Sequence, residues 1–176
     1  MGTAAFHQLW VGMVPGTPIG PVWVGVSGSG LAALEIGGSH QDFVQSLSDR
    51  RSVNVTIDDS RTSLVVSQIS EYLNGARKRF DLPIDWSVMT QFQVKTLRAV
   101  YAIPYGDTRT YSQIAAQIGA PRAQRAVGRA NATNPIPLVI PCHRVIGADG
   151  SLRGYGSGDG ISTKTWLLEL EKLHSA

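Results

Sequence analysis

The first part of the chain alternates short apolar runs with turn-forming residues. Apolar runs at residues 11–14, 22–26 and 31–36 are separated by stretches rich in Pro, Gly and Ser at residues 15–18 and 27–30. Runs of this length, bounded by such residues, are typical of antiparallel strands joined by tight turns. The pattern therefore predicts a β-meander.

A helical period follows the meander between residues 61 and 73. Asn74-Gly75 supplies a stop signal directly after it. Residues 80–90 contain Pro83 and several polar residues and predict a linker. Residues 1–88 are therefore expected to form a small N-terminal α/β domain with its linker. The apolar positions that define the helix are Leu64, Val65, Ile69, Tyr72 and Leu73.

Residues 89–176 have a different character, with short helical stretches separated by Pro and Gly. The first helix is expected to begin near residue 91 and to end before Pro104. Thr108 or Thr110 can cap a second helix through residue 118, and Pro121 is expected in the first turn of a third helix that ends near residue 131. The pattern predicts a mostly helical C-terminal domain with a helix-turn-helix. The first helix is expected to carry an apolar stripe of Phe92, Val94, Leu97, Val100 and Tyr101.

Charge is concentrated in this second region. The chain carries a net charge of +3, but the window from Lys95 to Asn131 holds six basic residues and one acidic residue. Such a window favours a polyanion-binding face, although a solvated helix surface would also produce it.

The predicted third helix places Arg122, Arg125 and Arg129 three and four residues apart, and therefore on one face. The positions between them include small residues such as Gly128, which costs about 1 kcal/mol relative to Ala inside a helix. Close contact with another surface, either DNA or a neighbouring helix, would explain that glycine. Alanine and arginine suit phosphate contacts and the minor groove better than base-edge readout, and Arg125 is the candidate to fill the gap left by an extruded base.

The chain contains one cysteine and four scattered histidines, so we expect no disulfide, no metal and no cofactor. No segment approaches the length of a membrane span, and residues 1–10 lack a secretory pattern. We expect a soluble cytoplasmic protein without a membrane partner, associated with the nucleoid if the source is prokaryotic.

The single cysteine, Cys142, follows a proline-rich apolar stretch at residues 134–141. The prolines exclude a helix, so this stretch is expected to be an extended, buried segment that ends at Cys142. A buried cysteine is usually inert packing.

The adjoining His143 favours a reactive cysteine instead, because a thiol needs a base or a cation nearby to react as thiolate. In an extended segment the two side chains would point to opposite faces, so a turn or a bridging water would be needed. The final predicted helix, residues 163–173, can supply a carboxylate to orient the imidazole, from Glu169 or Glu171. Residues 154–160 form a glycine-rich loop whose free amides could line a pocket.

The sequence resembles the O6-alkylguanine-DNA alkyltransferase family. The resemblance is close over residues 91–173 and looser before them, where Thr17-Pro18-Ile19-Gly20-Pro21 carries it. The most specific element is Ile-Pro-Cys-His-Arg-Val at residues 140–145. Other elements in the family's order are Ile103-Pro104-Tyr105-Gly106, Thr110-Tyr111-Ser112-Gln113-Ile114-Ala115, Arg125-Ala126-Val127-Gly128, Asn134-Pro135 and Trp166-Leu167-Leu168-Glu169-Leu170-Glu171.

The resemblance implies a ribonuclease H-like first domain and an irreversible, single-turnover transfer of an alkyl group from guanine O6 in double-stranded DNA to Cys142. It implies that His143 acts as base through water, that Glu171 orients His143 and that Asn134 holds the active-site turn. O4-alkylthymine is left open as a second substrate. The protein is expected to act as a monomer, with cooperative assembly on DNA left open.

The resemblance also assigns the DNA face and the substrate pocket. Tyr111 would rotate the nucleotide, Arg125 would replace it in the stack, and the minor groove would be bound with the help of Thr110, Arg122, Gly128 and Arg129. The pocket for the flipped base would be formed by Tyr111, Val145, Tyr155 and Gly156. The loop at Gly156–Gly160 departs from the family by two extra residues, which bears on the width of the pocket.

Each assignment has a simpler alternative: Tyr111 as a core aromatic, Asn134 as a turn former and Glu171 as a solvated charge. Three other functions compete at the level of the whole protein. A non-catalytic lesion sensor is disfavoured by the presence of Cys142. A cysteine hydrolase would leave the basic helix without a role, and a transcription regulator would need a better base-reading face.

Overall fold

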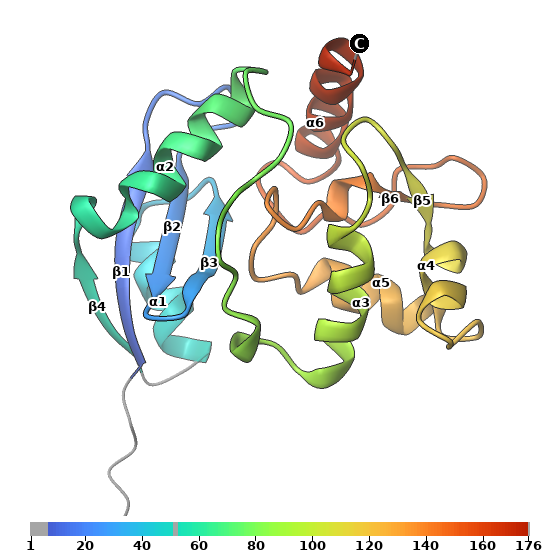
Figure 1. The fold of residues 1–176 in the computed structure, drawn as a ribbon, viewed down its shortest axis with the longest axis horizontal. Helices are drawn as coiled ribbons and strands as arrows, with labels where there is room; N and C mark the ends of the chain where they lie inside the picture. Colours follow the sequence, from blue (N-terminus) through green and yellow to red (C-terminus); the bar gives the residue numbers. More distant parts are fainter. Residues whose placement is uncertain (1–6, 51–52, 176) are drawn as a thin grey trace, which may run out of the picture.

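The computed structural model describes residues 7–50 and 53–175 (Figure 1). A sheet with two helices occupies the N-terminal region, and most of the remaining helices lie together in the C-terminal region. This is the mixed architecture expected from the sequence, with a small α/β region followed by a mostly helical one. Helix α6 stands at the top of the view and ends beside the C-terminus.

The N-terminal region contains a four-stranded sheet in the order β3-β2-β1-β4. The predicted meander is confirmed, because β2 pairs antiparallel with both β1 and β3. Strand β4 pairs parallel with β1 and was not predicted. The strands are β1 (His7–Val14), β2 (Val22–Ser27), β3 (Gly30–Ile36) and β4 (Val53–Ile57).

The two helices of this region cover opposite faces of the sheet. Helix α2 (Asp59–Leu73) packs Val65 and Ile69 into the core cluster that contains Val24 of β2, whereas α1 (His40–Arg50) packs Phe43 against a separate cluster on the other face. Helix α2 begins two residues before its predicted start, because the Asp58 side chain caps it. The sequence did not predict α1.

The linker is attached to the edge of the sheet. The Leu31 amide donates to the Pro83 carbonyl at 2.8 Å, and the Asp85 amide donates to the Leu31 carbonyl at 2.9 Å. Gly30 has a φ of 132°, and a Cβ at this position would overlap the Pro83 carbonyl. The linker therefore approaches β3 closely at a position that requires glycine. A short 3₁₀ turn, Trp86–Val88, follows it.

The C-terminal region begins with α3 (Gln91–Tyr101), which Thr90 and Gln93 close with a capping box. Thr110, one of the two caps left open by the sequence, forms the same kind of box with Gln113 at the start of the next helix. The other elements are β5 (Arg109–Thr110), α4 (Tyr111–Gln117), α5 (Gln124–Ala132), β6 (Val145–Ile146) and α6 (Ile161–His174).

Three details of the predicted helices are wrong. Pro121 lies in the turn before α5 and not in its first turn, because α5 begins at Gln124. On α3, Phe92 and Tyr101 are exposed, and the buried face includes Thr96 and Ala99 instead. Leu173 on α6 is 77% exposed and does not belong to the core.

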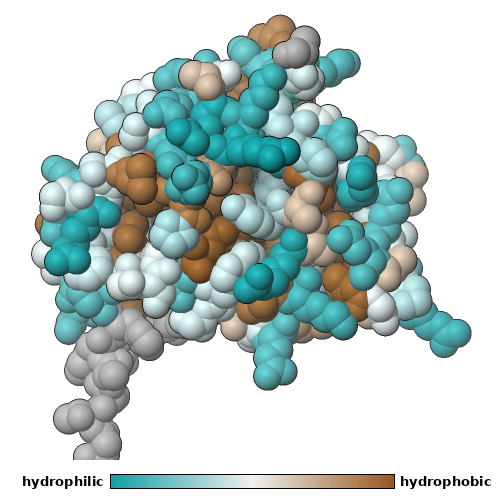
Figure 2. Space-filling view, viewed as in Figure 1, coloured by the Kyte–Doolittle hydropathy of each residue, from teal (hydrophilic) through white to brown (hydrophobic). Residues whose placement is uncertain are grey.

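The surface on the side drawn in Figure 1 is mostly hydrophilic, with its hydrophobic areas separated by polar side chains (Figure 2). Among residues 7–50 and 53–175, no helix combines the length and the apolar character that crossing a bilayer requires.

Candidate functional site

The segment that leads to Cys142 is folded into a turn and is not extended as predicted. The Ile140 amide donates to the Ile136 carbonyl at 3.0 Å, and Leu138 has a φ of 70°. Prolines exclude a long helix here, but they do not exclude a compact turn, which is how this stretch buries its apolar side chains. Cys142 then opens a 3₁₀ helix, Cys142–Arg144.

Asn134 closes this turn with its side chain. Its Oδ1 accepts from the Ile136 amide at 3.0 Å, and its Nδ2 donates to the Ile140 carbonyl at 2.9 Å. Asn134 also forms a hydrogen bond with the Cys142 side chain, which favours the thiolate. The sequence-predicted Asn134 is therefore in contact with both the turn and the sulfur.

The Cys142 side chain is 4% exposed. Burial raises the pKa of this thiol, and the hydrogen bond from Asn134 and the charge of Lys164 oppose that shift without cancelling it. The thiol is therefore protonated at neutral pH in the free protein and needs a base before it can react as a nucleophile.

His143 and Glu171 form the buried pair expected from the sequence. His143 Nε2 lies 2.7 Å from Glu171 Oε1, and both residues are 0% exposed. Burial lowers the pKa of His143, so its imidazole is neutral at neutral pH. Among the described residues, no side chain or backbone group bonds to His143 Nδ1, which is therefore available to accept a proton.

Glu171 is the centre of a larger hydrogen-bond network than the sequence suggested. Burial works against ionisation of Glu171, but hydrogen bonds from His143 and Arg144 outweigh it and lower the pKa to about 2. Arg144 donates to both carboxylate oxygens, the Gly106 amide donates to Oε2 at 3.0 Å, and the Tyr72 hydroxyl donates to Oε1 at 2.5 Å. The carboxylate is thus charged, buried and held from four sides.

Sequence reasoning missed three of these partners. Gly106 and Arg144 lie within motifs that resemble the family, but no role was predicted for them. Tyr72 lay on the apolar stripe of α2 and was indistinguishable from a core aromatic. A buried tyrosine generally needs a partner for its hydroxyl, and that was the only available signal.

Two of the residues assigned to the substrate pocket, Tyr111 and Tyr155, lie close enough to Cys142 for its charge to contribute, after burial, to raising their pKa. Tyr155 is buried. Burial is the main cause that raises its pKa, and the charge of the Cys142 thiolate is the second. Val145 is fully buried in β6, and its carbonyl accepts from Lys164 Nζ at 2.6 Å. The Tyr111 hydroxyl donates to the Arg153 carbonyl at 3.0 Å. Gly156 is exposed, and a Cβ there would lie 3.0 Å from the Ala132 carbonyl oxygen.

The glycine-rich loop does not present a row of free amides, as the sequence had suggested. The Gly158 amide donates to the Ile36 carbonyl at 3.2 Å, and the Gly160 amide donates to the Ser157 carbonyl at 3.1 Å. The first of these bonds ties the loop to the end of β3 in the N-terminal region.

The predicted DNA face lies on α5 and the turn before it. Arg125 and Arg129 project from exposed positions on the helix, and Arg122 is exposed in the turn, so these three arginines do not share one helix. No ion pair joins them to another residue of the described ranges. A Cβ on Gly128 would meet the Tyr111 ring at 3.9 Å, an ordinary contact, so packing within the protein does not require this glycine.

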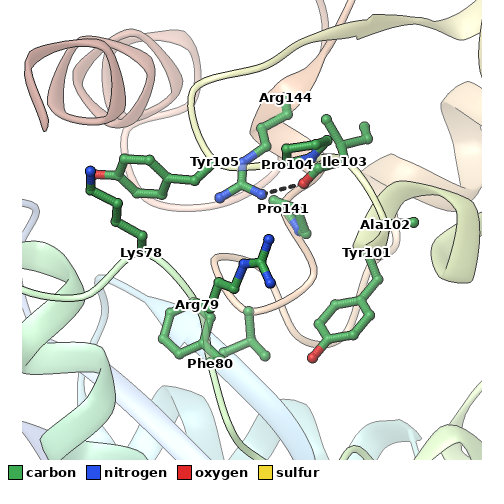
Figure 3. A pocket seen from close by; sticks show the side chains of 11 residues that line it. Lys78, Arg79, Phe80, Tyr101, Ala102, Ile103, Pro104, Tyr105, Pro141 and Arg144 are labelled. Carbon is green, nitrogen blue, oxygen red and sulfur yellow. Dashed lines mark hydrogen bonds between the residues drawn. The ribbon is translucent and has the colours of Figure 1, made fainter. Parts of the chain in front are cut away.

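A cavity of about 320 Å³ lies behind the cysteine segment (Figure 3). It is lined by Phe80, Tyr105, Pro141 and Arg144 among others, and Cys142 is not in its wall. Figure 3 shows the Arg144 guanidinium reaching from this cavity to the Ile103 carbonyl, a hydrogen bond of 2.6 Å. Among the described residues, no group of three or more His, Cys, Asp and Glu side chains could hold a metal ion.

Two family models match the chain. Residues 15–86 match the ribonuclease-like domain of 6-O-methylguanine DNA methyltransferase, and residues 91–173 match its DNA binding domain. A methylated-DNA--protein-cysteine methyltransferase of Mycobacterium tuberculosis is 44% identical over 156 residues, which cover 89% of this chain and 88% of that protein. The protein of the same name from Methanosarcina barkeri is 42% identical, with coverage of 89% and 93%.

Solved structures agree with these sequence matches. A crystal structure of Mycobacterium tuberculosis OGT in complex with DNA has a TM-score of 0.78 and 40% sequence identity, and the match covers 97% of this chain and 94% of that chain. An O6-methylguanine-DNA methyltransferase from Pyrococcus kodakaraensis has a TM-score of 0.62 at 26% identity, with coverage of 93% and 98%.

Proposed function

This chain belongs to the 6-O-methylguanine DNA methyltransferase family, and from that premise we propose that Cys142 is the residue that accepts the alkyl group. The protein is a DNA-repair alkyltransferase that acts on O6-alkylguanine in DNA. One observation carries the assignment of Cys142, the buried pair of His143 and Glu171. His143 follows the chain's single cysteine directly in sequence, and its Nδ1 has no hydrogen-bond partner among the described residues.

The reaction proceeds by proton removal and one displacement. His143 Nδ1 takes the proton of the Cys142 thiol through a bridging water. The thiolate then attacks the alkyl carbon, a sulfur–carbon bond forms, and the carbon–O6 bond breaks. The electron pair of that bond passes to the guanine, which takes up a proton and is restored. A thioether is not readily hydrolysed, so each protein molecule reacts once.

Glu171 and Asn134 do not react themselves: Glu171 acts through His143, and Asn134 acts through Cys142. Glu171 accepts the Nε2 hydrogen of His143 and so keeps Nδ1 open, and its charge stabilises the imidazolium formed when the proton is taken. Asn134 holds the turn that presents the sulfur and lowers the cost of the thiolate through its hydrogen bond. The proposed chemistry uses these side chains together with one bridging water and calls for no metal or cofactor.

The DNA duplex is bound through its minor groove by α5 and the preceding turn. Arg122 and Arg129 contact phosphates, and Thr110 and Gly128 allow a close approach of the backbone. Tyr111 rotates the damaged nucleotide, and Arg125 fills the space that it leaves in the stack. Support comes from the exposure of all three arginines and from Gly128, which no packing contact within the described residues requires to be glycine.

The flipped base enters a pocket formed by Tyr111, Val145, Tyr155 and Gly156. In the free protein the Tyr111 hydroxyl is bonded to the Arg153 carbonyl, so contact with guanine requires that this bond be exchanged. The loop that carries Gly156 has two more residues than the family pattern and is tied to the end of β3 through Gly158. Its position therefore governs which alkyl groups are accepted.

We divide the chain functionally at residue 88. Residues 1–88 support the catalytic network from outside, and residues 89–176 bind DNA and carry the chemistry. The protein acts as a monomer in the cytoplasm and is associated with the nucleoid if the source is prokaryotic. Cooperative assembly on DNA and a reaction with O4-alkylthymine are extensions that the same site could support.

A stoichiometry measurement tests this proposal. The protein is mixed with increasing excesses of a duplex that carries one O6-methylguanine with a labelled methyl group, and the label on protein and in solution is counted. We expect a plateau of one label per protein molecule, and none with Cys142→Ser. Release of label beyond one equivalent indicates a hydrolase that turns over, whereas tight binding without transfer indicates a lesion sensor. Either result contradicts the assignment.

A further inference from the structure

The shortest hydrogen bond to Glu171 comes from the N-terminal region. The Tyr72 hydroxyl donates to Glu171 Oε1 at 2.5 Å, against 2.7 Å for the distance between His143 Nε2 and the same oxygen. Tyr72 lies on α2 and is 0% exposed. Every side chain in the proposed reaction belongs to residues 89–176, so this contact is a direct side-chain link from the N-terminal region to the chemistry.

The hydrogen of the Tyr72 hydroxyl is committed to Glu171. The carboxylate has a pKa of about 2, so at neutral pH it is ionised and can accept hydrogen bonds but cannot donate one. Burial and the charge of Glu171 raise the pKa of Tyr72, so the phenol keeps its proton. Because a phenol has one hydrogen, the Tyr72 oxygen can offer only lone pairs to its second neighbour, His143 Nε2 at 3.3 Å.

His143 Nε2 is therefore faced by two acceptors, the carboxylate oxygen and the phenol oxygen. A nitrogen lone pair in this position would be repelled by both, so Nε2 carries the hydrogen. In a neutral imidazole the lone pair then belongs to Nδ1, which has no partner among the described residues.

We propose that Tyr72 is a positioning residue for alkyl transfer, which fixes Glu171 and the protonation pattern of His143 from the N-terminal region. This inference rests on the proposed role of Cys142 and His143. Tyr72 does not touch the substrate or the sulfur. It ensures that the proton-accepting nitrogen is the one left open.

The ring of Tyr72 is held so that its hydroxyl cannot turn away. It packs against Phe80 of the linker, with ring centroids 5.0 Å apart, and the edge of Tyr105 meets it at 5.9 Å with an interplanar angle of 87°. Both Phe80 and Tyr105 also line the cavity behind the cysteine segment (Figure 3). The linker and the loop after α3 thus fix the phenol from two directions.

The other charged groups around this pair are already engaged. Arg144 donates to Glu171 and to the Ile103 carbonyl, and Lys164 donates to the carbonyls of Val145 and Arg153. The hydroxyl of Tyr72 is thus the donor that α2 supplies to the carboxylate, and Tyr105 brings no further hydrogen bond within the described residues.

Tyr72→Phe removes the hydroxyl and keeps the packed ring. The alkyl-transfer rate is measured with free O6-benzylguanine so that DNA binding plays no part. It is expected to fall by about tenfold, because Glu171 and the Nε2 hydrogen of His143 are no longer held in place by a hydrogen bond to a charged group, which is among the stronger kinds. The carboxylate loses a donor and becomes a stronger partner for the imidazolium. The acidic limb of the rate–pH profile is therefore expected to move to higher pH.

Tyr105→Phe is the matched control, because it removes a neighbouring hydroxyl that lacks a hydrogen-bond partner in the described structure. Its rate and pH profile should equal those of the wild type. Wild-type behaviour of Tyr72→Phe, or a slower reaction with an unmoved acidic limb, would overturn the role of Tyr72. A wild-type protein that transfers no benzyl group would instead overturn the proposed function.

A second measurement does not depend on any variant. Long-range ¹H–¹⁵N spectra of the wild-type protein at neutral pH report which ring nitrogen of each histidine carries hydrogen. His143 is identified by the loss of its signals in His143→Gln. We expect hydrogen on Nε2 only, and hydrogen on Nδ1 would contradict the inference even if Tyr72→Phe failed to fold.

Discussion

The cysteine segment and helix α5 lie in the same half of the molecule but are built in opposite ways. Cys142, His143 and Glu171 are almost completely buried, and Glu171 is held by four different residues. On α5 and the turn before it, the three arginines are exposed and make no ion pair within the described ranges. The hydrogen bonds of the first group are formed in the free protein, whereas the charges of the second group have no ion-pair partner in the part of the chain that the structure describes.

This difference separates the two tasks of a repair protein. The chemistry depends on buried hydrogen bonds whose positions are set when the chain folds, so it should respond strongly to single changes and weakly to salt. Binding to DNA depends on exposed charges, so it should respond modestly to single changes and strongly to salt. The following changes separate the two groups, beginning with the largest expected effect.

Glu171→Gln should damage both catalysis and the fold. It leaves Arg144 buried without its carboxylate and His143 without an anionic partner, so the free energy of unfolding should fall by about 3 kcal/mol. The transfer rate to free O6-benzylguanine should fall by about 100-fold or more. Chemical denaturation and single-turnover kinetics measure these effects. Glu169→Gln, on the exposed face of the same helix, should change neither.

The acid sensitivity of the wild-type protein should have the same origin. The pKa of Glu171 is about 2 in the folded protein, below its ordinary value of 4.5. Its ionised form therefore stabilises the fold fully above about pH 4.5, and this contribution is lost as the pH falls from 4.5 towards 2. Unfolding midpoints across this range should fall more steeply for the wild type than for Glu171→Gln. If the unfolding midpoints of the two proteins fell equally with pH, Glu171 would not be the origin of the acid sensitivity.

Arg125→Ala should affect DNA repair without affecting the chemistry. Repair of O6-methylguanine in a duplex should slow by about tenfold or more, because the extruded base leaves a gap that nothing fills. The reaction with free O6-benzylguanine should stay within about twofold of the wild type. Arg61→Ala, an exposed arginine on α2, is the control. Equal losses on both substrates would exclude a role in base flipping.

Arg129→Ala and Arg122→Ala should each remove one phosphate contact. The slope of log binding constant against log salt concentration should become less steep by about one unit for each variant, without a change in sequence preference. Fluorescence anisotropy with undamaged duplex measures the slope. An unchanged slope for both variants would mean that the basic face is assigned to the wrong surface.

Gly128→Ala should have the smallest effect. It should raise the stability of the protein and lower its affinity for duplex DNA. The new Cβ meets the Tyr111 ring at an ordinary contact distance, so helix α5 should gain up to about 1 kcal/mol from the better helix former. The same methyl group projects where DNA is expected to approach, so duplex affinity should fall severalfold. A higher melting temperature with unchanged affinity would place the DNA elsewhere.

Much of the fold could be predicted because local signals are strong in the parts concerned. The meander, the capped start of α4 and the final helix follow from turn residues, a capping box and helical periodicity. Helix α1 was missed because Phe43 and Leu47 are its buried apolar residues in a polar sequence. Strand β4 was missed because it is short and largely exposed.

Only those residues of the candidate site that lie within sequence motifs could be predicted. Cys142, His143, Glu171 and Asn134 were found through a motif, and the structure brings them together. Tyr72 lies 99 residues before its partner Glu171, and no pattern relates a tyrosine on an apolar helix stripe to a carboxylate in another region. The turn before Cys142 was predicted as extended, because prolines exclude a long helix without specifying which irregular structure replaces it.

The account rests above all on where the alkyl group goes. Trypsin cleavage after Arg129 and Arg144 releases residues 130–144, a peptide that contains the single cysteine. After reaction with a duplex carrying one O6-methylguanine, fragmentation of this peptide should place one added methyl group on Cys142 in every protein molecule, and on no residue of Cys142→Ser. An unmodified Cys142 alongside repaired DNA, or a methyl group on another residue, would contradict the account.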